Sequence, residues 1–329
     1  MENIKDLYPL KFETIFKDKI WGGNKIKSIL GKDFGSLPNC GETWELSGVD
    51  GNVSVVKEGP LAGISLNELI SIYKEKLMGT RVYEKFGNEF PLLIKFIDAN
   101  EDLSIQVHPD DELAKRRHSS FGKTEMWYIM QADPGAFLYV GFDKSLSHEE
   151  YKHHIKENTI LDVLHKEKVD AGDVFFIPAG RVHSIGKGIL LAEIQQTSDV
   201  TYRIYDFERK DNQGNTRQLH TEESVDAIDF RVLPDYKSPY NFNLNTSEKI
   251  VESPYFQTNL LEIDAVYELD GHGKEAFTIL ICMEGEAVLS GESGDYNLKM
   301  GDVVLIPACL SHVELSPRNK CKILETKVP

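Results

Sequence analysis

Gly172-Asp-Val-Phe-Phe-Ile-Pro-Ala-Gly-Arg-Val-His183 returns in altered form as Gly301-Asp-Val-Val-Leu-Ile-Pro-Ala-Cys-Leu-Ser-His312. The Gly-Asp pair, the first Val, the Ile-Pro-Ala and the final His keep the same offsets in both stretches. In each stretch we expect Gly-Asp to form a hairpin turn, the apolar residues to form a buried strand, and Pro to end the pairing. The chain therefore contains two copies of one β module.

The segments around this repeat indicate how the copies are organised. Glu125 is followed ten residues later by a glycine, and so is Glu275, which suggests that these two acidic residues are equivalent. The first copy is longer, and we attribute the surplus to a small helical insertion at about residues 145–168, which opens with a possible capping box at Ser147. Leu233–Glu252, rich in Pro, Asn and Ser, is typical of a linker.

Short strands dominate the rest of the pattern, and helical periodicity is clear in few places, such as Ser65–Lys76. The strands that we predict are Leu92–Ile97, Leu103–Val107, Met126–Met130, Ala136–Val140, Val174–Ile177, Ile189–Glu193 and Thr201–Tyr205. We therefore expect a mainly β protein with two jelly-roll β-barrel modules and a few short helices. The expected domains are residues 1–235, including the N-terminal segment and the insertion, and residues 236–329.

Composition excludes several kinds of partner. The 329-residue chain has 53 acidic and 37 basic side chains, a net charge of −16, which argues against nucleic acid or an anionic membrane. An anionic substrate would need a local cationic pocket. The four cysteines show no CxxC spacing, and the N-terminus has no apolar signal region, so we expect a cytoplasmic protein with reduced thiols.

A metal site is predicted from two strand-borne motifs. Alternate residues of a strand share a face, so Gln106 and His108 should point the same way, while Val107 points into the core. Glu125 begins the next predicted strand, and His183 follows the first Pro-Ala. Two imidazoles, a carboxylate and an amide oxygen suit a borderline divalent ion such as Zn²⁺, with a position left for water or substrate.

Each of these residues alone has a simpler explanation, since a single His at a strand end is more often structural than a ligand. Two other functions also fit the set: an Fe(II) dioxygenase, which uses two His and one carboxylate, and a sugar-binding regulator without catalysis. The second copy keeps Glu275 and His312 but has no His pair before them. We therefore expect it to be degenerate and the chain to bind one Zn²⁺.

Longer stretches resemble the type I mannose-6-phosphate isomerase family of the cupin superfamily. The resemblance covers most of residues 10–230 and fades in the second module. It is carried by Trp21-Gly-Gly, Gly41-Glu-Thr-Trp-Glu45, Pro91 to Asp111, Gly122-Lys-Thr-Glu-Met-Trp-Tyr128, Pro178 to His183 and Glu193 to Asp206. The chain lacks the large helical domain of longer members and looks like the compact bacterial form.

The resemblance implies two cupin-type barrels and a zinc enzyme that interconverts mannose 6-phosphate and fructose 6-phosphate through an enediol. It maps the zinc ligands onto Gln106, His108, Glu125 and His183, and the essential arginine onto Arg203. It also implies a small phosphosugar as the partner.

Further roles follow from the residues themselves. Glu193 shares a strand face with Gln195 and is our candidate base, although it could instead pair with Arg203 and only position it. Arg203 could stabilise the enediolate. For substrate binding we expect Ser104 and Arg209 at the phosphate, with Lys95 and Lys123 lining the mouth. The expected assembly is a monomer or a weak homo-oligomer.

Overall fold

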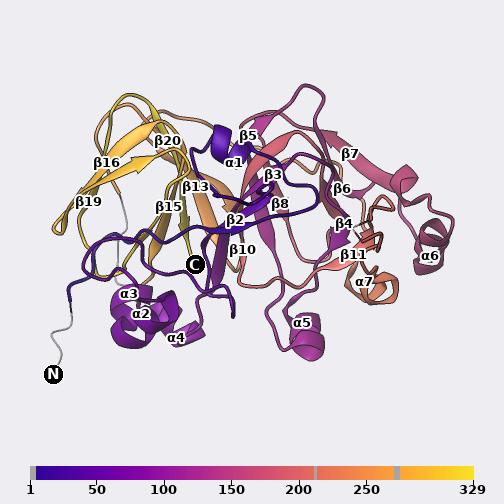
Figure 1. Ribbon diagram of the computed structural model, residues 1–329, viewed down its shortest axis with the longest axis horizontal. Coiled ribbons are helices and arrows are strands. Elements are labelled where there is room, and N and C mark those ends of the chain that lie inside the picture. The colour runs from indigo at the N-terminus through magenta and orange to yellow at the C-terminus, as the bar shows by residue number, and fades with distance from the viewer. Residues whose placement is uncertain (1–4, 211–212, 270–274) are drawn as a thin grey trace.

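The computed structural model describes residues 5–210, 213–269 and 275–329. Its strands form four sheets, which group into two units that lie side by side (Figure 1). The first unit uses strands up to Tyr205, and the second uses strands from Ser247 onward. The expectation of a mainly β fold is confirmed. In the described ranges, no helix has the length and apolar composition needed to cross a bilayer.

The first unit pairs a six-stranded sheet with a five-stranded one. The larger sheet has the order β1 (Ile15–Lys17), β2 (Glu42–Leu46), β3 (Leu92–Ala99), β10 (Ile189–Gln196), β5 (Glu125–Ala132) and β8 (Val174–Ile177). The smaller sheet has the order β11 (Tyr202–Tyr205), β4 (Ile105–Val107), β9 (His183–Ile185), β6 (Phe137–Phe142) and β7 (Leu164–Lys168).

The second unit repeats this plan with fewer strands. One sheet has the order β12 (Ser247–Glu252), β13 (Gln257–Ile263), β20 (Cys321–Lys327), β15 (Thr278–Glu284) and β18 (Val303–Ile306). The other has the order β14 (Tyr267–Glu268), β19 (Val313–Pro317), β16 (Glu286–Gly291) and β17 (Gly294–Lys299). The helices are α1 (Lys25–Ser28), α2 (Leu66–Tyr73), α3 (Glu75–Met78), α4 (Thr80–Phe86), α5 (Asp111–His118), α6 (His148–Lys156), the short 3₁₀ helix η1 (Ile160–Val163) and α7 (Thr221–Ala227).

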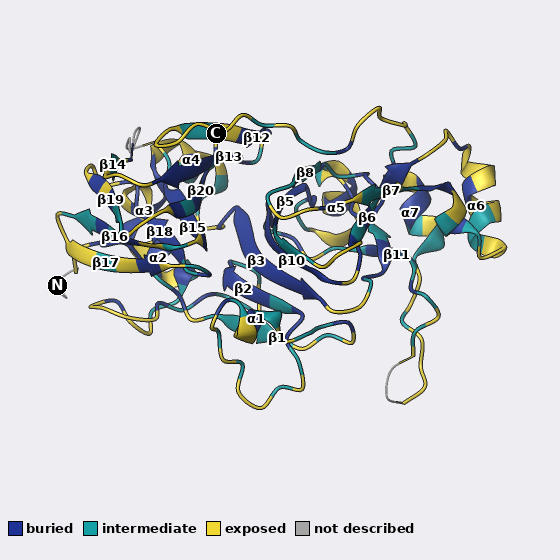
Figure 2. Ribbon diagram, turned by 90° about the horizontal axis from the view of Figure 1, so that it is seen from above, coloured by how far each residue is buried: buried dark blue, intermediate teal, exposed yellow. Residues whose placement is uncertain are grey.

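Strand β10 is buried on both faces, as the dark ribbon at the centre of Figure 2 shows. Leu190, Ala192 and Ile194 belong to the apolar core between the two units. Successive strand residues point to opposite faces, so Leu191 and Glu193 point into the first unit. This inner face changes from apolar at Leu191, which packs in the interior core, to charged at Glu193. Strand β10 thus carries a charged side chain, Glu193, into the interior of the first unit.

The strand register corrects one equivalence that we inferred from the sequence. Ile177 and Ile306 occupy the same place in the repeated stretch, and they lie opposite Glu125 and Thr278, respectively. The residue equivalent to Glu125 is therefore Thr278, and the match with Glu275 was wrong. Glu275 lies three residues before the strand and is 71% exposed. The ten-residue spacing between glutamate and glycine was misleading, because Glu125 begins its strand whereas Glu275 precedes its strand by three residues.

The predicted helices are present but shorter than expected. A capping box at Ser65 starts α2, and the helix ends at Tyr73, because the next residue, Lys74, has a φ of 48° that breaks the helical path before α3. A capping box at Ser147 likewise starts α6. The expected insertion is helical only as far as η1, because its last residues form β7 at the edge of the sheet. The end of the expected linker also pairs, as β12.

The N-terminal helices α2–α4 attach to the second unit rather than to the barrel that follows them in sequence. Backbone N–H groups of Phe277 and Ala308 donate to carbonyls of Met78 and Leu77 at 3.1 and 3.0 Å. Gly79, between α3 and α4, has a φ of +87°, and a Cβ there would lie 2.3 Å from the backbone N of Ala276. The two units are thus joined by close backbone contact as well as by side chains.

This contact predicts a stability difference between two glycines. Gly79→Ala and Gly63→Ala both place a side chain at a positive φ near +86°, but nothing lies within 4 Å of the Cβ position at Gly63. Gly79→Ala should therefore lower the free energy of unfolding by about 1–3 kcal/mol more than Gly63→Ala, because only the first creates a backbone clash. Urea unfolding of both variants measures the difference. Equal losses would contradict the close interface.

Candidate metal centre

Three strand ends deliver the predicted ligands to one point inside the first unit. Gln106 lies on β4 and is the direct partner of His183, the first residue of β9. His108 follows β4, and Glu125 begins β5 opposite the end of β8. His108, Glu125 and His183 are each at most 1% exposed.

The ligand atoms converge closely. His108, Glu125 and His183 each offer a ligand atom, and these three atoms lie within 4.8 Å of one another. Nε2 of His108 is 3.6 Å from one carboxylate oxygen of Glu125, and Nε2 of His183 is 3.3 Å from the other. The side-chain amide of Gln106 lies 3.3 Å from His183 Nε2. Because amide O and N are interchangeable by a flip, Gln106 can turn its oxygen toward the same point.

Backbone carbonyls fix the orientation of both imidazoles. Nδ1 of His108 lies 3.0 Å from the carbonyl oxygen of Val200, and Nδ1 of His183 lies 2.8 Å from that of Arg181. A carbonyl only accepts, so the proton sits on Nδ1 and the Nε2 lone pair faces the centre. Burial and then the nearby Lys123 lower the pKa of His108 well below its usual value and that of His183 to about 3. Both rings are therefore neutral at physiological pH.

This donor set fits a divalent metal ion. Neutral imidazoles with inward lone pairs and a carboxylate are the forms that ligate a metal. One oxygen of Glu125 is buried without a hydrogen-bond partner among the described residues, which is costly unless another group satisfies it. Gln106, His108, Glu125 and His183 are the residues that would hold the ion.

Buried charges surround this centre. The ammonium of Lys123 contacts Glu125, lies 3.0 Å from His108 Nε2 and is 4.0 Å from Glu193. Lys95 donates to Glu193 at 3.1 Å, and the indole of Trp127 donates to the other oxygen at 2.9 Å. Lys95, Lys123 and Glu193 are each at most 6% exposed. Two lysines thus face two glutamates, Glu125 and Glu193, so the charges of this buried set are paired.

The two carboxylates at the centre differ in their acidity. Burial raises the pKa of Glu125 to about 7, with help from the negative charge of Glu193 and against Lys123. Burial would also raise the pKa of Glu193, but Lys123 and Lys95 outweigh it and lower the value to about 2. Glu193 is thus ionised at neutral pH.

Arg203 lies beside the centre on β11. It pairs directly with Gln106, so both side chains lie on the same face of the sheet. Its backbone N–H donates to His220 Nδ1 at 3.0 Å, and its Nη1 donates to the Gln218 carbonyl at 3.0 Å. Arg203 and Glu193 do not pair within the described part of the chain, since Glu193 binds Lys95 and Trp127 instead. The alternative role of Glu193 as a simple partner of Arg203 was wrong.

The remaining predicted residues lie further out. Ser104 is buried and lies just before β4, but no hydrogen bond of its side chain joins it to the centre in the described ranges. Arg209 binds Asp206 at 2.6 Å and the Asp102 carbonyl rather than the metal ligands.

Sequence reasoning also missed a carboxylate, Glu42. It lies on β2, where it accepts from Trp44 Nε1 at 2.9 Å. Burial raises the pKa of Glu42, but Lys95 and Lys19 outweigh it, and the net pKa is lowered. In the sequence, the only indication of a role for Glu42 was its position in the Gly41–Glu45 motif.

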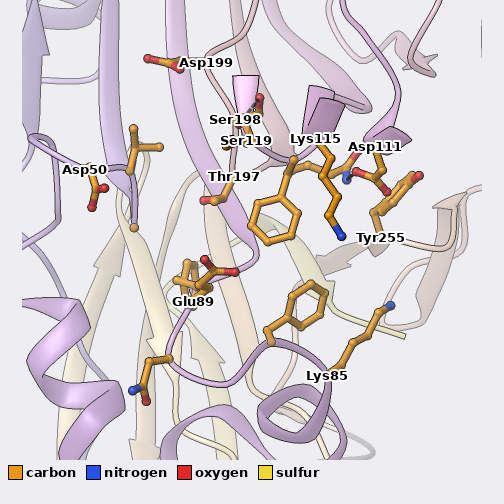
Figure 3. A pocket seen from close by; sticks show the side chains of 18 of the residues that line it. Asp50, Lys85, Glu89, Asp111, Lys115, Ser119, Thr197, Ser198, Asp199 and Tyr255 are labelled. Carbon is orange, nitrogen blue, oxygen red and sulfur yellow. Dashed lines mark hydrogen bonds between the residues drawn. The ribbon is translucent and has the colours of Figure 1, made fainter. Parts of the chain in front are cut away.

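A separate cavity lies between the two units, away from these residues (Figure 3). Its lining includes residues of α4 and α5, residues 48–50, 88–90 and 196–199 and, in the second unit, Pro254 and Tyr255. None of the four predicted metal ligands lines it. The cavity and the metal centre are therefore distinct features.

Two family models and several known proteins are similar to this chain. Residues 9–136 match the model of the phosphomannose isomerase type I catalytic domain, and residues 246–325 match the mannose-6-phosphate isomerase cupin domain. The chain is 37% identical to the mannose-6-phosphate isomerase of Streptococcus mutans over 91% of this chain and 92% of that protein. It is 35% identical to mannose-6-phosphate isomerase ManA of Bacillus subtilis over 95% and 97% of the two chains.

A solved structure shows the same architecture. The crystal structure of the mannose 6-phosphate isomerase from Bacillus subtilis superposes with a TM-score of 0.87 at 31% identity, covering 97% of this chain and 99% of that one. The similarity runs through both units and includes the strands that carry the ligands. This chain belongs to the type I phosphomannose isomerase family.

Proposed function

We propose that this protein is a zinc-dependent aldose–ketose isomerase that interconverts mannose 6-phosphate and fructose 6-phosphate. The observation that carries the proposal is the buried His108–Glu125–His183 centre, with two neutral imidazoles, in a chain 37% identical to a mannose-6-phosphate isomerase over nearly its whole length. Two nitrogen donors, a carboxylate and an amide favour zinc among the divalent ions.

We further propose one zinc per chain, held in a catalytic domain of residues 1–235, with residues 236–329 as a degenerate cupin module. Two features of the second unit support this. Thr278 stands where the first unit has Glu125, and His312 is 73% exposed. The described residues contain one cluster of three potential ligands, and it is the one in the first unit. His272 lies outside the described residues.

In the proposed reaction a proton moves between C1 and C2 of the sugar, through an enediol intermediate. When bound, zinc would polarise the substrate oxygen and stabilise the developing negative charge. Arg203, on the same sheet face as Gln106, adds a fixed positive charge at the same place. The inward carboxylate of Glu193 is the proposed base for the proton. Lys95 and Lys123 hold Glu193 in place and bind the sugar hydroxyls.

The low pKa of Glu193 makes it a weak base, so Lys123 is the competing proton carrier. Ser104 and Arg209 are proposed for the phosphate end of the substrate. The position of Arg209, whose guanidinium donates to the Asp102 carbonyl just before β4, supports this role. The four cysteines are free thiols, which supports the proposed cytoplasmic location.

A coupled assay tests the function. Mannose 6-phosphate should be converted to fructose 6-phosphate, the rate should fall to background after chelation, and added Zn²⁺ should restore it. Restoration by Fe(II) together with oxygen consumption would instead favour a dioxygenase. No conversion by the zinc-loaded protein would contradict the proposal.

The metal centre is tested by removing one ligand. His183→Ala should weaken zinc binding by more than about 100-fold, because loss of a direct ligand exceeds the effect of losing a supporting hydrogen bond. His312→Ala is the matched control, since it removes the equivalent but exposed histidine of the second unit. Elemental analysis after dialysis should give one zinc in the control and little in His183→Ala. Full occupancy in His183→Ala would refute the site.

Arg203 is tested by kinetics. Arg203→Ala should lower kcat and kcat/KM together by about 10²- to 10³-fold, the usual cost of removing a group that stabilises transition-state charge. Zinc content should stay at the wild-type level. Arg203→Lys should recover only part of the rate, since a point charge does not replace a planar fork. A change confined to KM would make Arg203 a simple binding residue.

The identity of the base is tested with Glu193→Gln and Lys123→Met. If Glu193 carries the proton, Glu193→Gln should slow exchange of the C2 proton with deuterated solvent by about 10²- to 10⁴-fold. Lys123→Met should then retain measurable exchange. Near-normal exchange in Glu193→Gln, with complete loss in Lys123→Met, would transfer the role to the lysine.

A further inference from the structure

The carboxylate of Asp111 ties together chain segments that carry the metal ligands. Asp111 begins α5, three residues after His108. One oxygen of its carboxylate accepts from the backbone N–H of Gly122 at 2.8 Å and from the side-chain amide of Gln196 at 2.9 Å. Gly122 precedes Glu125 by three residues. A single carboxylate thus holds the segments of two metal ligands, His108 and Glu125, against the end of β10.

Gln196 extends this link to the residue before Glu125. Its side-chain oxygen accepts from the backbone N–H of Thr124 at 2.9 Å, and its own backbone N–H donates to the Thr124 carbonyl at 3.1 Å. The Thr124 hydroxyl in turn accepts from the backbone N–H of Ala179 at 3.2 Å, in the turn that precedes His183. Thr124 and Gln196 are each at most 4% exposed. Buried hydrogen bonds are stronger than those in water, so these bonds fix the backbone that carries Glu125.

The second unit reaches this network through Tyr255. Tyr255 lies in the turn between β12 and β13 and, like Asp111 and Gln196, lines the cavity between the units. Its side chain lies beside Asp111 (Figure 3), and its hydroxyl donates to the Asp111 carboxylate. Burial, the negative charge of Asp111 and this hydrogen bond raise the pKa of Tyr255 to about 12. The hydroxyl therefore keeps its proton at physiological pH and remains a donor.

The turn that carries Tyr255 is held on both sides. The hydroxyl of Ser253 accepts from the backbone N–H groups of Tyr255 and Phe256 at 3.3 and 3.1 Å. Phe256 is fully buried in the apolar core between the units. Its ring packs edge-on against Phe176 of β8, with 6.5 Å between the ring centroids. Docking of the two units therefore sets the position of the Tyr255 hydroxyl.

We propose that Tyr255 and Gln196 are positioning residues, through which the second unit holds the metal ligand Glu125 in place. The Tyr255 hydroxyl binds the Asp111 carboxylate, which binds the Gln196 amide. The amide in turn binds the backbone of Thr124, next to Glu125. This inference rests on the proposed zinc centre, and it gives the second unit a role that needs no metal of its own. Groups outside the direct ligands change metal affinity because they orient the ligating atoms.

Tyr255→Phe removes only the hydroxyl, and Tyr240→Phe is its matched control. Tyr240 is also half-buried, and its hydroxyl donates to the carbonyl of Gly172 at 2.8 Å, beside a part of β5 beyond Glu125. Tyr255→Phe should weaken zinc binding by about 2- to 10-fold, the usual value of one hydrogen bond. Tyr240→Phe should leave the zinc affinity unchanged. Competition titration against a chelating zinc indicator measures both affinities.

Gln196→Met tests whether the effect passes through the amide. Methionine is similar in size but cannot bind Asp111 and Thr124, so zinc affinity should fall by about 10-fold. Adding Tyr255→Phe to Gln196→Met should cause no further loss, because the link is already broken. The visible spectrum of the cobalt(II)-loaded protein, which reports ligand geometry, should change in both single variants and stay unchanged in Tyr240→Phe. Additive losses of affinity would show that Tyr255 acts by another route and would overturn the inference.

Zinc affinity and isomerase activity are measured separately, so the two proposals can fail separately. A wild-type protein that binds zinc but does not convert mannose 6-phosphate would refute the proposed function alone. Equal zinc affinities and cobalt spectra in Tyr255→Phe and Tyr240→Phe would overturn this inference and leave the function standing. Urea unfolding detects a purely structural role: lower stability of Tyr255→Phe with wild-type zinc affinity would also overturn the inference.

Discussion

The structure depends on the double burial of the central strands β3 and β10. Their outer residues join the apolar core between the two units, and their inner residues line the first barrel. Because strand side chains alternate, the same eight residues of β10 hold the units together and carry Glu193 inward. The second unit therefore supports the metal centre indirectly, by covering strands that could not remain in water.

The charges inside this barrel are costly to bury. Lys95, Lys123, Glu125 and Glu193 form a connected set that is almost inaccessible to solvent. Buried ion pairs contribute little net stability, since desolvation offsets their attraction, while removal of one partner costs about 3–5 kcal/mol. Such a set is best explained by chemistry at the centre. The apolar core between the units supplies the stability that tolerates it.

The sequence predicted the parts that local pattern determines. The repeat located β8 and β18, and the alternation in Gln106-Val-His108 anticipated that both side chains would approach His183. The predicted equivalence of Glu125 and Glu275 was wrong, because strand register is decided only in the folded sheets. The register makes Thr278 the equivalent of Glu125. The contacts of Glu193 with Lys95 and Trp127 could not be foreseen, since the strands that carry the three residues meet only in the folded sheet.

The central claim is that backbone carbonyls at Val200 and Arg181 turn both imidazoles so that Nε2 faces one metal ion. A crystal structure of the zinc-loaded protein, with anomalous data at the zinc edge, tests this most directly. The account predicts one zinc peak bound by Nε2 of His108, Nε2 of His183 and the Glu125 carboxylate, with Zn–N distances of about 2.0–2.1 Å. Zinc bound through Nδ1, or located away from these residues, would contradict it.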